Sequence, residues 1–276
     1  MPELPEVETV RTGLLAHVVG HKITSATQLH ERALNPRSIA PIEDLAGSTV
    51  LDIKRRGKFL WFELDRPDVL VAHLGMSGQF LIDPRETRHT RAIFTLKKGR
   101  KETALHFNDQ RTFGWVSLER KTDGVPTSVA KIAPDIFEPS FDQAAVIANV
   151  GRRKVKIKTA ILNQNIVSGI GNIYADEALW LARVHPESIT HEMSAAAIGR
   201  TLDCAKEVMS QAIKVGGTSF DDLYINVNGE SGYFAISLNA YGRENEPCSR
   251  CGTPIKRISF ANRSSHFCPR CQKKRG

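Results

Sequence analysis

The chain has 276 residues, of which 41% are hydrophobic, so it is long enough to bury more than one domain core. Its formal net charge of +8 at pH 7 favours a polyanionic partner, with an anionic membrane surface as the alternative. No apolar run approaches the ~20 residues that span a bilayer. The acidic start, MPELPEVETV, is unlike a secretory signal peptide. We therefore expect a cytoplasmic, nucleoid-associated protein that does not bind membranes.

The spacing of apolar residues changes along the chain. Residues 1–20 predict one amphipathic helix that ends at Gly20. Residues 22–120 hold short β-rich runs, which predict an antiparallel sandwich or barrel: Val50–Ile53, Phe59–Leu64, Val69–Leu74, Ala92–Leu96, Thr103–Phe107 and Phe113–Leu118. Helical spacing returns in Phe141–Val150, Val155–Leu162, Ile173–Leu181 and Ala195–Val215. Residues 216–240 are rich in Gly, Asn, Asp and Ser and predict a long loop.

Four of the five cysteines form two closely spaced pairs near the C-terminus. They are Cys248-x2-Cys251 and, after sixteen further residues, Cys268-x2-Cys271. Two such pairs supply the four thiolates of a tetrahedral Zn²⁺ site. Two disulfides are the alternative, which the absence of other secretory features disfavours. The surrounding basic residues indicate that this zinc module faces nucleic acid.

The first six residues could provide a nucleophile. Methionine before the small residue Pro2 is normally removed, which leaves a secondary amine at the chain start. An α-amino group titrates near ~8, so an appreciable fraction is unprotonated at neutral pH. Its attack on a carbonyl-level carbon gives an iminium, with Glu3 next to it as a candidate acid. The alternative is that Pro2 and Pro5 only stiffen the helix entry.

Several further motifs each have an ordinary structural alternative. Lys58 follows Gly57 in a basic turn between two expected strands. Met76 lies between two glycines, and Arg111 pairs with Phe113 in Asp-Gln-Arg-Thr-Phe-Gly. An apolar wedge with Arg and Phe is suited to unstacking a base step. Gly169, Gly171 and Asn172 place backbone N–H groups at a helix start, which suits phosphate.

Together these motifs resemble the bacterial formamidopyrimidine-DNA glycosylases over essentially the whole chain. The PELPEVE start, the GIGNIYADEAL block and the four-cysteine ribbon carry the resemblance. It implies an α+β multidomain fold with a β-sandwich domain flanked by helices (1–132), a linker (133–140), a helix–two-turns–helix domain (141–240) and a zinc finger (241–276). It also implies that double-stranded DNA with oxidised or abasic nucleotides lies between the halves of a monomer.

The resemblance implies roles for individual residues. Pro2 matches the nucleophile, Glu3 the proton donor, Lys58 the general acid/base and Arg263 the finger arginine of δ-elimination. Residues matching DNA contacts are Met76, Arg111, Phe113, Asn172, His89, Lys154 and Lys158. Residues Gly216–Tyr233 match the loop over a flipped 8-oxoguanine. The implied activity is removal of oxidised purines with β,δ-elimination, and the single zinc is structural.

Three rival interpretations remain. An endonuclease VIII-type enzyme, which prefers oxidised pyrimidines, shares the chemistry, but its members usually carry glycine where this chain has Leu4. A non-catalytic lesion-binding protein would need a retained initiator methionine. A zinc-ribbon transcription factor leaves the N-terminal half unexplained. Asn163-Gln164 replaces the usual Asp-Gln, and Gln110-Arg111-Thr112 replaces the common Pro-Arg-Arg, so lesion and opposite-base preference stay open.

Overall fold

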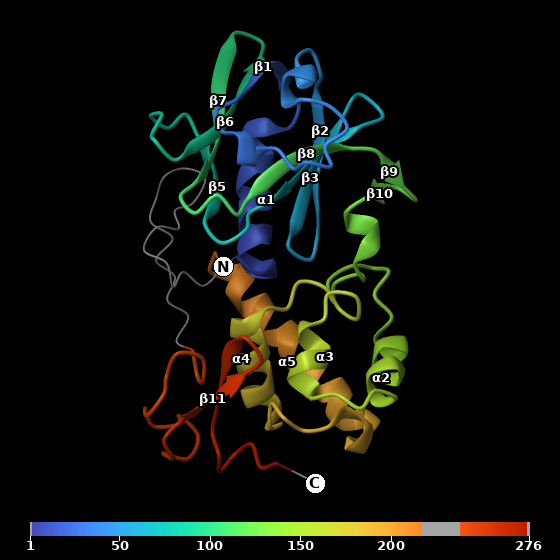
Figure 1. Ribbon diagram of the computed structural model, residues 1–276, viewed down its shortest axis with the longest axis vertical. Coiled ribbons are helices and arrows are strands. Elements are labelled where there is room, and N and C mark those ends of the chain that lie inside the picture. Colours follow the sequence, from blue (N-terminus) through green and yellow to red (C-terminus); the bar gives the residue numbers. More distant parts are fainter. Residues whose placement is uncertain (1, 217–237, 275–276) are drawn as a thin grey trace. The chain divides into compact units, whose positions relative to one another are not determined.

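A computed structural model describes residues 2–216 and 238–274. The predicted lesion loop, Gly216–Tyr233, therefore lies almost wholly outside the described residues. The chain divides into two compact units, residues 1–131 with 216–234 and residues 132–215 with 235–276. Figure 1 shows the elements of each unit, coloured along the sequence from blue at the N-terminus to red at the C-terminus.

The first unit consists of two antiparallel four-stranded sheets and one long helix, α1 (Leu4–Val18). One sheet has the order β1-β6-β7-β5 and the other β2-β3-β4-β8. Their strands are β1 (Lys22–Gln28), β2 (Val50–Arg56), β3 (Phe59–Leu64), β4 (Val69–His73), β5 (Gly78–Ile82), β6 (Thr90–Lys98), β7 (Lys101–Asp109) and β8 (Trp115–Glu119). Short elements complete the unit: β9 (Lys121–Thr122), β10 (Val125–Pro126) and the 3-10 helices η1 (Glu31–Ala33), η2 (Ile42–Leu45) and η3 (Val129–Lys131).

Both sheets and α1 bury their apolar side chains in one shared core. In β6, burial alternates from residue to residue, which is the period of a strand with one face covered. The rings of Phe62 in β3 and Phe80 in β5 pack edge to face across the two sheets, with centroids 5.7 Å apart. The predicted sandwich is therefore confirmed, with α1 contributing Val7, Val10, Leu14 and Val18 to its core.

The second unit is helical and ends in a small β-hairpin. Its helices are α2 (Gln143–Gly151), α3 (Ile157–Leu162), α4 (Asn172–Ala182), η4 (Thr190–Glu192) and α5 (Ala195–Lys214), and the hairpin pairs β11 (Lys256–Phe260) with β12 (Arg263–Phe267). Helix α4 is buried on almost every side and packs against both α5 and β12. A second small core joins Trp180 of α4 to Ile255 and the cysteine-bearing turns. Within the described residues, no helix combines the length and apolar character needed to cross a bilayer.

Candidate active site and metal centre

The N-terminal residues form a tightly bonded entry to α1. Glu3 directly precedes the helix, and its backbone N–H donates to Oε2 of Glu6 at 2.9 Å. Both glutamates are buried. Glu6 therefore fixes the peptide next to Pro2, the residue that would carry the predicted amine.

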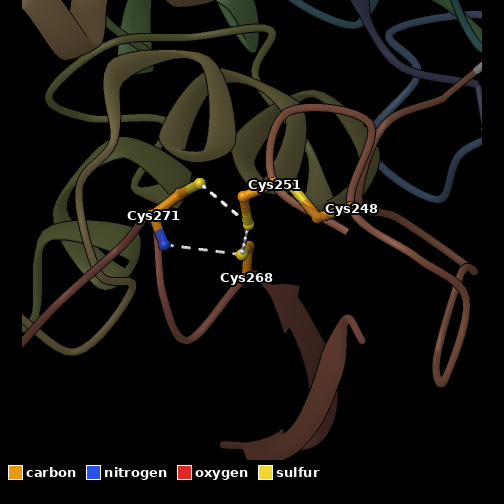
Figure 2. Close-up of side chains that lie close together, drawn as sticks. All are labelled: Cys248, Cys251, Cys268 and Cys271. Atoms are coloured by element: carbon orange, nitrogen blue, oxygen red, sulfur yellow. Dashed lines mark hydrogen bonds between the residues drawn. The ribbon is translucent and has the colours of Figure 1, made fainter. Parts of the chain in front are cut away.

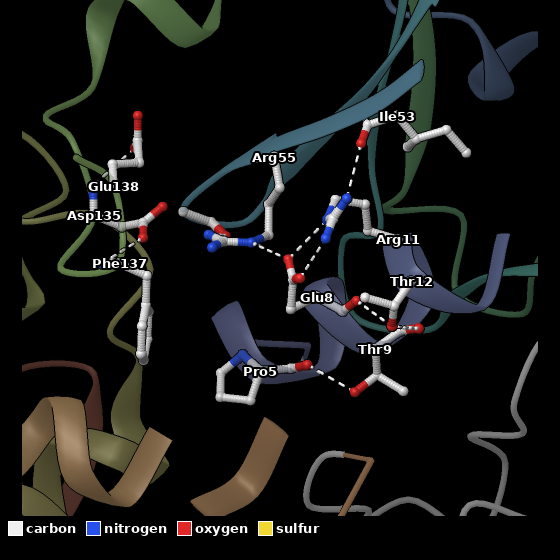
Figure 3. Close-up of polar contacts among 11 residues, drawn as sticks. Pro5, Glu8, Thr9, Arg11, Thr12, Ile53, Arg55, Asp135, Phe137 and Glu138 are labelled. Carbon is white, nitrogen blue, oxygen red and sulfur yellow. Dashed lines mark hydrogen bonds and ion pairs between the residues drawn. The ribbon is translucent and has the colours of Figure 1, made fainter. Parts of the chain in front are cut away.

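A carboxylate clamp ties α1 to the strand that leads to Lys58 (Figure 3). Glu8 accepts hydrogen bonds from Arg11 at 2.6 Å and from Nε of Arg55, in β2, at 2.9 Å. Arg55 also donates to the carbonyl of Gly57 at 3.3 Å. Burial opposes the charge on Glu8, but the two arginines outweigh it and lower the pKa of Glu8. The helix that follows Glu3 and the turn that carries Lys58 are thus fastened to the same ion-paired group.

Lys58 occupies the second position of a two-residue hairpin turn between β2 and β3. The first position, Gly57, has φ of +56°, which glycine adopts without a steric penalty. The positive charge of the Lys58 ammonium repels a proton on the His73 imidazole. His73 is in β4 and pairs with Phe59 of β3. Burial and this positive charge lower the pKa of His73 to about 4, so its imidazole is neutral at physiological pH. Nδ1 of His73 accepts the backbone N–H of Gly75 at 3.1 Å.

Met76, Arg111 and Phe113 lie on two adjacent loops of the first unit. Met76 is in the β4–β5 loop, and the other two are in the β7–β8 loop. The Arg111 guanidinium lies 3.9 Å from Sδ of Met76. Phe113 is 61% exposed, so an apolar ring stands in solvent on the same loop as Arg111. The structure thus brings Met76 and Arg111 together, as the predicted base-step wedge requires.

The helix–turn segment of the second unit is built around Gln164. Its side-chain amide donates to the carbonyls of Leu162 and Ile170 and accepts the N–H of Gly169. Asn172 is the first residue of α4, and its Oδ1 has no partner among the described residues. Anions bind well at this end of a helix, and the phosphate contact of Asn172 stays a prediction. Lys154 is exposed and His89 is half-buried, and their DNA contacts stay predictions.

The predicted phosphate contact of Lys158 is wrong. Its side chain is 0% exposed, and Nζ lies 2.6 Å from Oδ1 of Asp176 and 3.0 Å from the carbonyl oxygen of Ser264. The ammonium could reach a DNA phosphate only by breaking a buried ion pair. Its role is inside the unit, where it joins α3, α4 and the hairpin strand that begins at Arg263.

The four cysteines of the C-terminal module converge from two turns (Figure 2). All four Sγ atoms lie within 4.8 Å of one another, and Cys251 Sγ is 3.5 Å from Cys268 Sγ. Zn²⁺ with bonds of ~2.3 Å to four thiolates needs sulfur atoms about 3.8 Å apart, so the donors fit one tetrahedral zinc ion. Hydrogen bonds from the hydroxyl and backbone of Thr253 lower the pKa of Cys251 to about 6, which favours the thiolate. Trp180 also donates to Cys248 Sγ at 3.4 Å and connects the module to α4.

Three family models match the chain in succession. They are described as the formamidopyrimidine-DNA glycosylase N-terminal domain (residues 1–116), the H2TH domain of the same enzyme (132–223) and the zinc finger found in FPG and IleRS (245–274). The chain belongs to the formamidopyrimidine-DNA glycosylase family. It is thereby a DNA-repair glycosylase that carries a structural zinc finger.

Known members of the family match the chain over its full length. The formamidopyrimidine-DNA glycosylase of Corynebacterium glutamicum strain R is 53% identical, with all of both chains covered. The crystal structure of MutM (Fpg) from Thermus thermophilus is 34% identical with a TM-score of 0.86, and both chains are covered completely. A mutant of Lactococcus lactis Fpg, solved with Fapy-dG containing DNA, is 35% identical with a TM-score of 0.85, covering 99% of this chain and 100% of that one.

Sequence reasoning missed several residues that organise the glycosylase site. Glu8 is not singled out by any pattern, and Asp109 and Asp176 stand out only as members of the Asp-Gln-Arg-Thr-Phe-Gly and GIGNIYADEAL motifs. Asp176 and Glu177 are two adjacent acidic residues within a largely apolar helix, and this pattern could have indicated buried partners. Asp109 and Glu8 stand in polar segments, where a carboxylate carries no such signal.

Proposed function

We propose that this glycosylase is bifunctional: it excises oxidised purines, such as 8-oxoguanine and formamidopyrimidines, and then cleaves the DNA strand by β,δ-elimination. The observation that carries the proposal is the N-terminal arrangement, in which the buried Glu6 carboxylate accepts the backbone N–H of Glu3, the buried residue next to Pro2. The Lactococcus lactis relative was solved with Fapy-dG containing DNA, which supports a purine lesion as substrate.

The reaction begins after removal of the initiator methionine. The lone pair of the Pro2 amine attacks C1′ of the damaged nucleotide, and the base leaves with the electrons of the glycosidic bond and takes up the proton that the amine nitrogen loses. The sugar ring opens at its C1′–O4′ bond as Glu3 delivers a proton to O4′. The product is an iminium that joins Pro2 to the open sugar.

Strand cleavage follows from the iminium, which withdraws electrons from C2′. Loss of a C2′ proton expels the 3′ phosphate (β-elimination), and a second proton loss expels the 5′ phosphate (δ-elimination). Lys58 serves the first elimination, and Arg263, at the start of β12, serves the second. Water then hydrolyses the iminium, which frees Pro2 and leaves a one-nucleotide gap. The zinc ion stabilises the finger and takes no part in these steps.

DNA binding in this proposal depends on the basic charge of the chain, so affinity should fall steeply with added salt. Met76, Arg111 and Phe113 enter the space that the flipped nucleotide leaves, with Arg111 facing the orphaned cytosine. Asn172, His89 and Lys154 contact phosphates. The protein acts on duplex DNA as a monomer in the cytoplasmic nucleoid.

Product analysis tests the proposal. A duplex with one 8-oxoguanine opposite cytosine and a matched duplex with dihydrouracil are each incubated with the zinc-loaded protein. We expect a gap with phosphate at both ends on the first duplex and far slower cleavage of the second. Cleavage of the dihydrouracil duplex alone would assign the chain to pyrimidine lesions, and binding without cleavage would make it a recognition protein.

A further inference from the structure

A buried carboxylate organises the two loops that carry Met76, Arg111 and Phe113. Asp109, the last residue of β7, is 0% exposed. Its Oδ1 accepts the hydroxyl of Ser77 at 2.5 Å and the backbone N–H of Arg111 at 3.1 Å, and its Oδ2 accepts the backbone N–H of Gly114 at 2.6 Å. One side chain therefore satisfies donors on both sides of Phe113 and reaches the neighbouring loop.

Ser77 completes the link between the loops. Its hydroxyl donates to Asp109 and accepts the backbone N–H of Arg111 at 3.0 Å. Ser77 directly follows Met76 in the chain. The Ser77 hydroxyl thus links the residue next to Met76 in one loop to the backbone of Arg111 in the other. The side chains of Met76 and Arg111 also touch.

The backbones of the two loops meet at glycines. A Cβ on Gly75 would lie 2.4 Å from the carbonyl carbon of Phe113, and Gly75 has φ of +61°. A Cβ on Gly114 would lie 2.9 Å from the Phe107 ring and 3.0 Å from the carbonyl oxygen of Leu74. Backbone approach this close requires residues without a Cβ, so the loops pack as one body.

We propose that Asp109 and Ser77 are positioning residues that lock the two loops into one preformed wedge. This inference rests on the proposed function, in which the wedge replaces an extruded base. Binding that orders flexible loops loses conformational entropy, and a preformed wedge avoids this loss at the moment of insertion. The exposed side chains then enter DNA while their backbone stays fixed by Asp109.

The test separates base extrusion from chemistry. Ser77→Ala removes the link, Ser77→Thr keeps a hydroxyl, and Asp109→Asn replaces an acceptor with an amide donor. Ser117→Ala is the matched control, because Ser117 is also buried in this unit but its Oγ has no partner among the described residues. For each zinc-loaded variant, single-turnover excision of 8-oxoguanine from duplex DNA is compared with strand cleavage at an abasic site in single-stranded DNA, which has no base pair to open.

We expect Ser77→Ala and Asp109→Asn to slow duplex excision by roughly 10- to 100-fold, while single-strand cleavage changes less than about threefold. Ser77→Thr should recover most of the excision rate, and Ser117→Ala should match the wild type. Unchanged duplex excision in Ser77→Ala, or an equal loss of both rates, would overturn the inference. If Asp109→Asn fails to fold, the comparison of Ser77→Ala with Ser77→Thr tests by itself whether the link between the loops speeds duplex excision.

A second readout distinguishes failure of the inference from failure of the proposed function. 2-Aminopurine placed beside a tetrahydrofuran abasic analogue reports insertion without any bond breaking. If the wild type inserts but cleaves no lesion, the proposed chemistry is wrong, and slower insertion by Ser77→Ala still supports the wedge. Equal insertion rates in Ser77→Ala and the wild type contradict the inference whatever the chemistry.

Discussion

Asp176 in α4 holds the backbone of His266 in the zinc-finger hairpin, with Oδ2 2.8 Å from the His266 nitrogen. Its Oδ1 accepts the Ser265 hydroxyl at 2.7 Å, and Lys158 bonds both Asp176 and the carbonyl of Ser264. Three consecutive residues after Arg263 are therefore fixed by one buried ion pair. Contacts with α3 and α4 therefore fix the backbone of the strand that carries Arg263.

Breaking this ion pair should affect δ-elimination more than excision. Asp176→Asn leaves the Lys158 ammonium buried without a counter-charge, which costs about 3–5 kcal/mol of unfolding free energy. We expect gel analysis of cleaved 8-oxoguanine duplex to show more β-product and less δ-product. The double variant Lys158→Met/Asp176→Leu is the control. It should unfold with nearly the wild-type free energy, but its ratio of β-product to δ-product should stay as high as in Asp176→Asn. An unchanged product ratio in Asp176→Asn would refute this link to Arg263.

Zinc removal should unfold the finger selectively. Elemental analysis is expected to give one zinc per chain, and Cys268→Ser should abolish tight binding. Because structural zinc supplies several kcal/mol of folding free energy, chelation should lower the melting temperature of the helical unit by about 10 °C or more. Trp180 fluorescence should report the change, because its indole contacts Cys248. Cys204→Ser, outside the cluster, should retain the metal; a stable, DNA-competent protein without metal would contradict the structural role.

Short β-rich runs separated by glycine, proline and aspartate made most of the sandwich predictable, but two strands of its sheets were missed. β1 buries only Ile23 and Ala26, and its register shifts between Ile23 and Ser25, so the alternation of a strand is lost. β5 follows directly on the glycine-flanked Met76 segment, whose turn signal hides the start of the strand. The helices α1 to α5 were found because their apolar spacing is regular, and all of them except α3 also carry proline, glycine or serine at or next to one end.

The site was predictable where its chemistry is local in the sequence. The cysteine pairs carry their role within a few residues, and the motif that predicts Pro2 as the nucleophile is equally short. The pairing of Ser77 with Asp109 joins loops 32 residues apart, and Lys158 meets Asp176 on a different helix. No short-range pattern distinguishes a lysine that reaches DNA from one that pairs inside the protein, so Lys158 was assigned incorrectly.

Stability of the sandwich unit should fall with acid because of His73. The folded pKa of His73, about 4, lies below its usual 6.5, so the unfolded chain binds the extra proton between these values. The stability that the neutral His73 imidazole contributes to the folded unit is complete above pH 6.5 and is lost as the pH falls toward 4. Allowing for partial exposure, it amounts to about 2–3 kcal/mol. Denaturant unfolding at pH 7 and pH 4 should show a smaller acid loss in His73→Asn; equal losses would contradict the assignment.

The Glu8 clamp should stabilise the first unit and support catalysis. Glu8→Gln leaves Arg11 and Arg55 without their shared counter-charge, at a cost of about 2 kcal/mol in unfolding free energy. Because the pKa of Glu8 is lowered on folding, this contribution is present above pH 4.5 and disappears as the pH falls below it. We also expect slower iminium formation, because the clamp holds both α1 and the Lys58 turn. Glu31→Gln, on an exposed 3-10 helix, is the control and should change neither quantity.

The central claim is that the amine of Pro2 forms a covalent bond with damaged DNA. Borohydride reduction during reaction with an 8-oxoguanine:cytosine duplex, followed by mass spectrometry of the linked peptide, tests it most directly. We predict a reduced adduct on Pro2 at the processed N-terminus, and no adduct at residue 2 in a Pro2→Leu variant, whose large second residue keeps the initiator methionine in place. An adduct on Lys58 or another lysine, or trapping undiminished by a blocked N-terminus, would contradict the account.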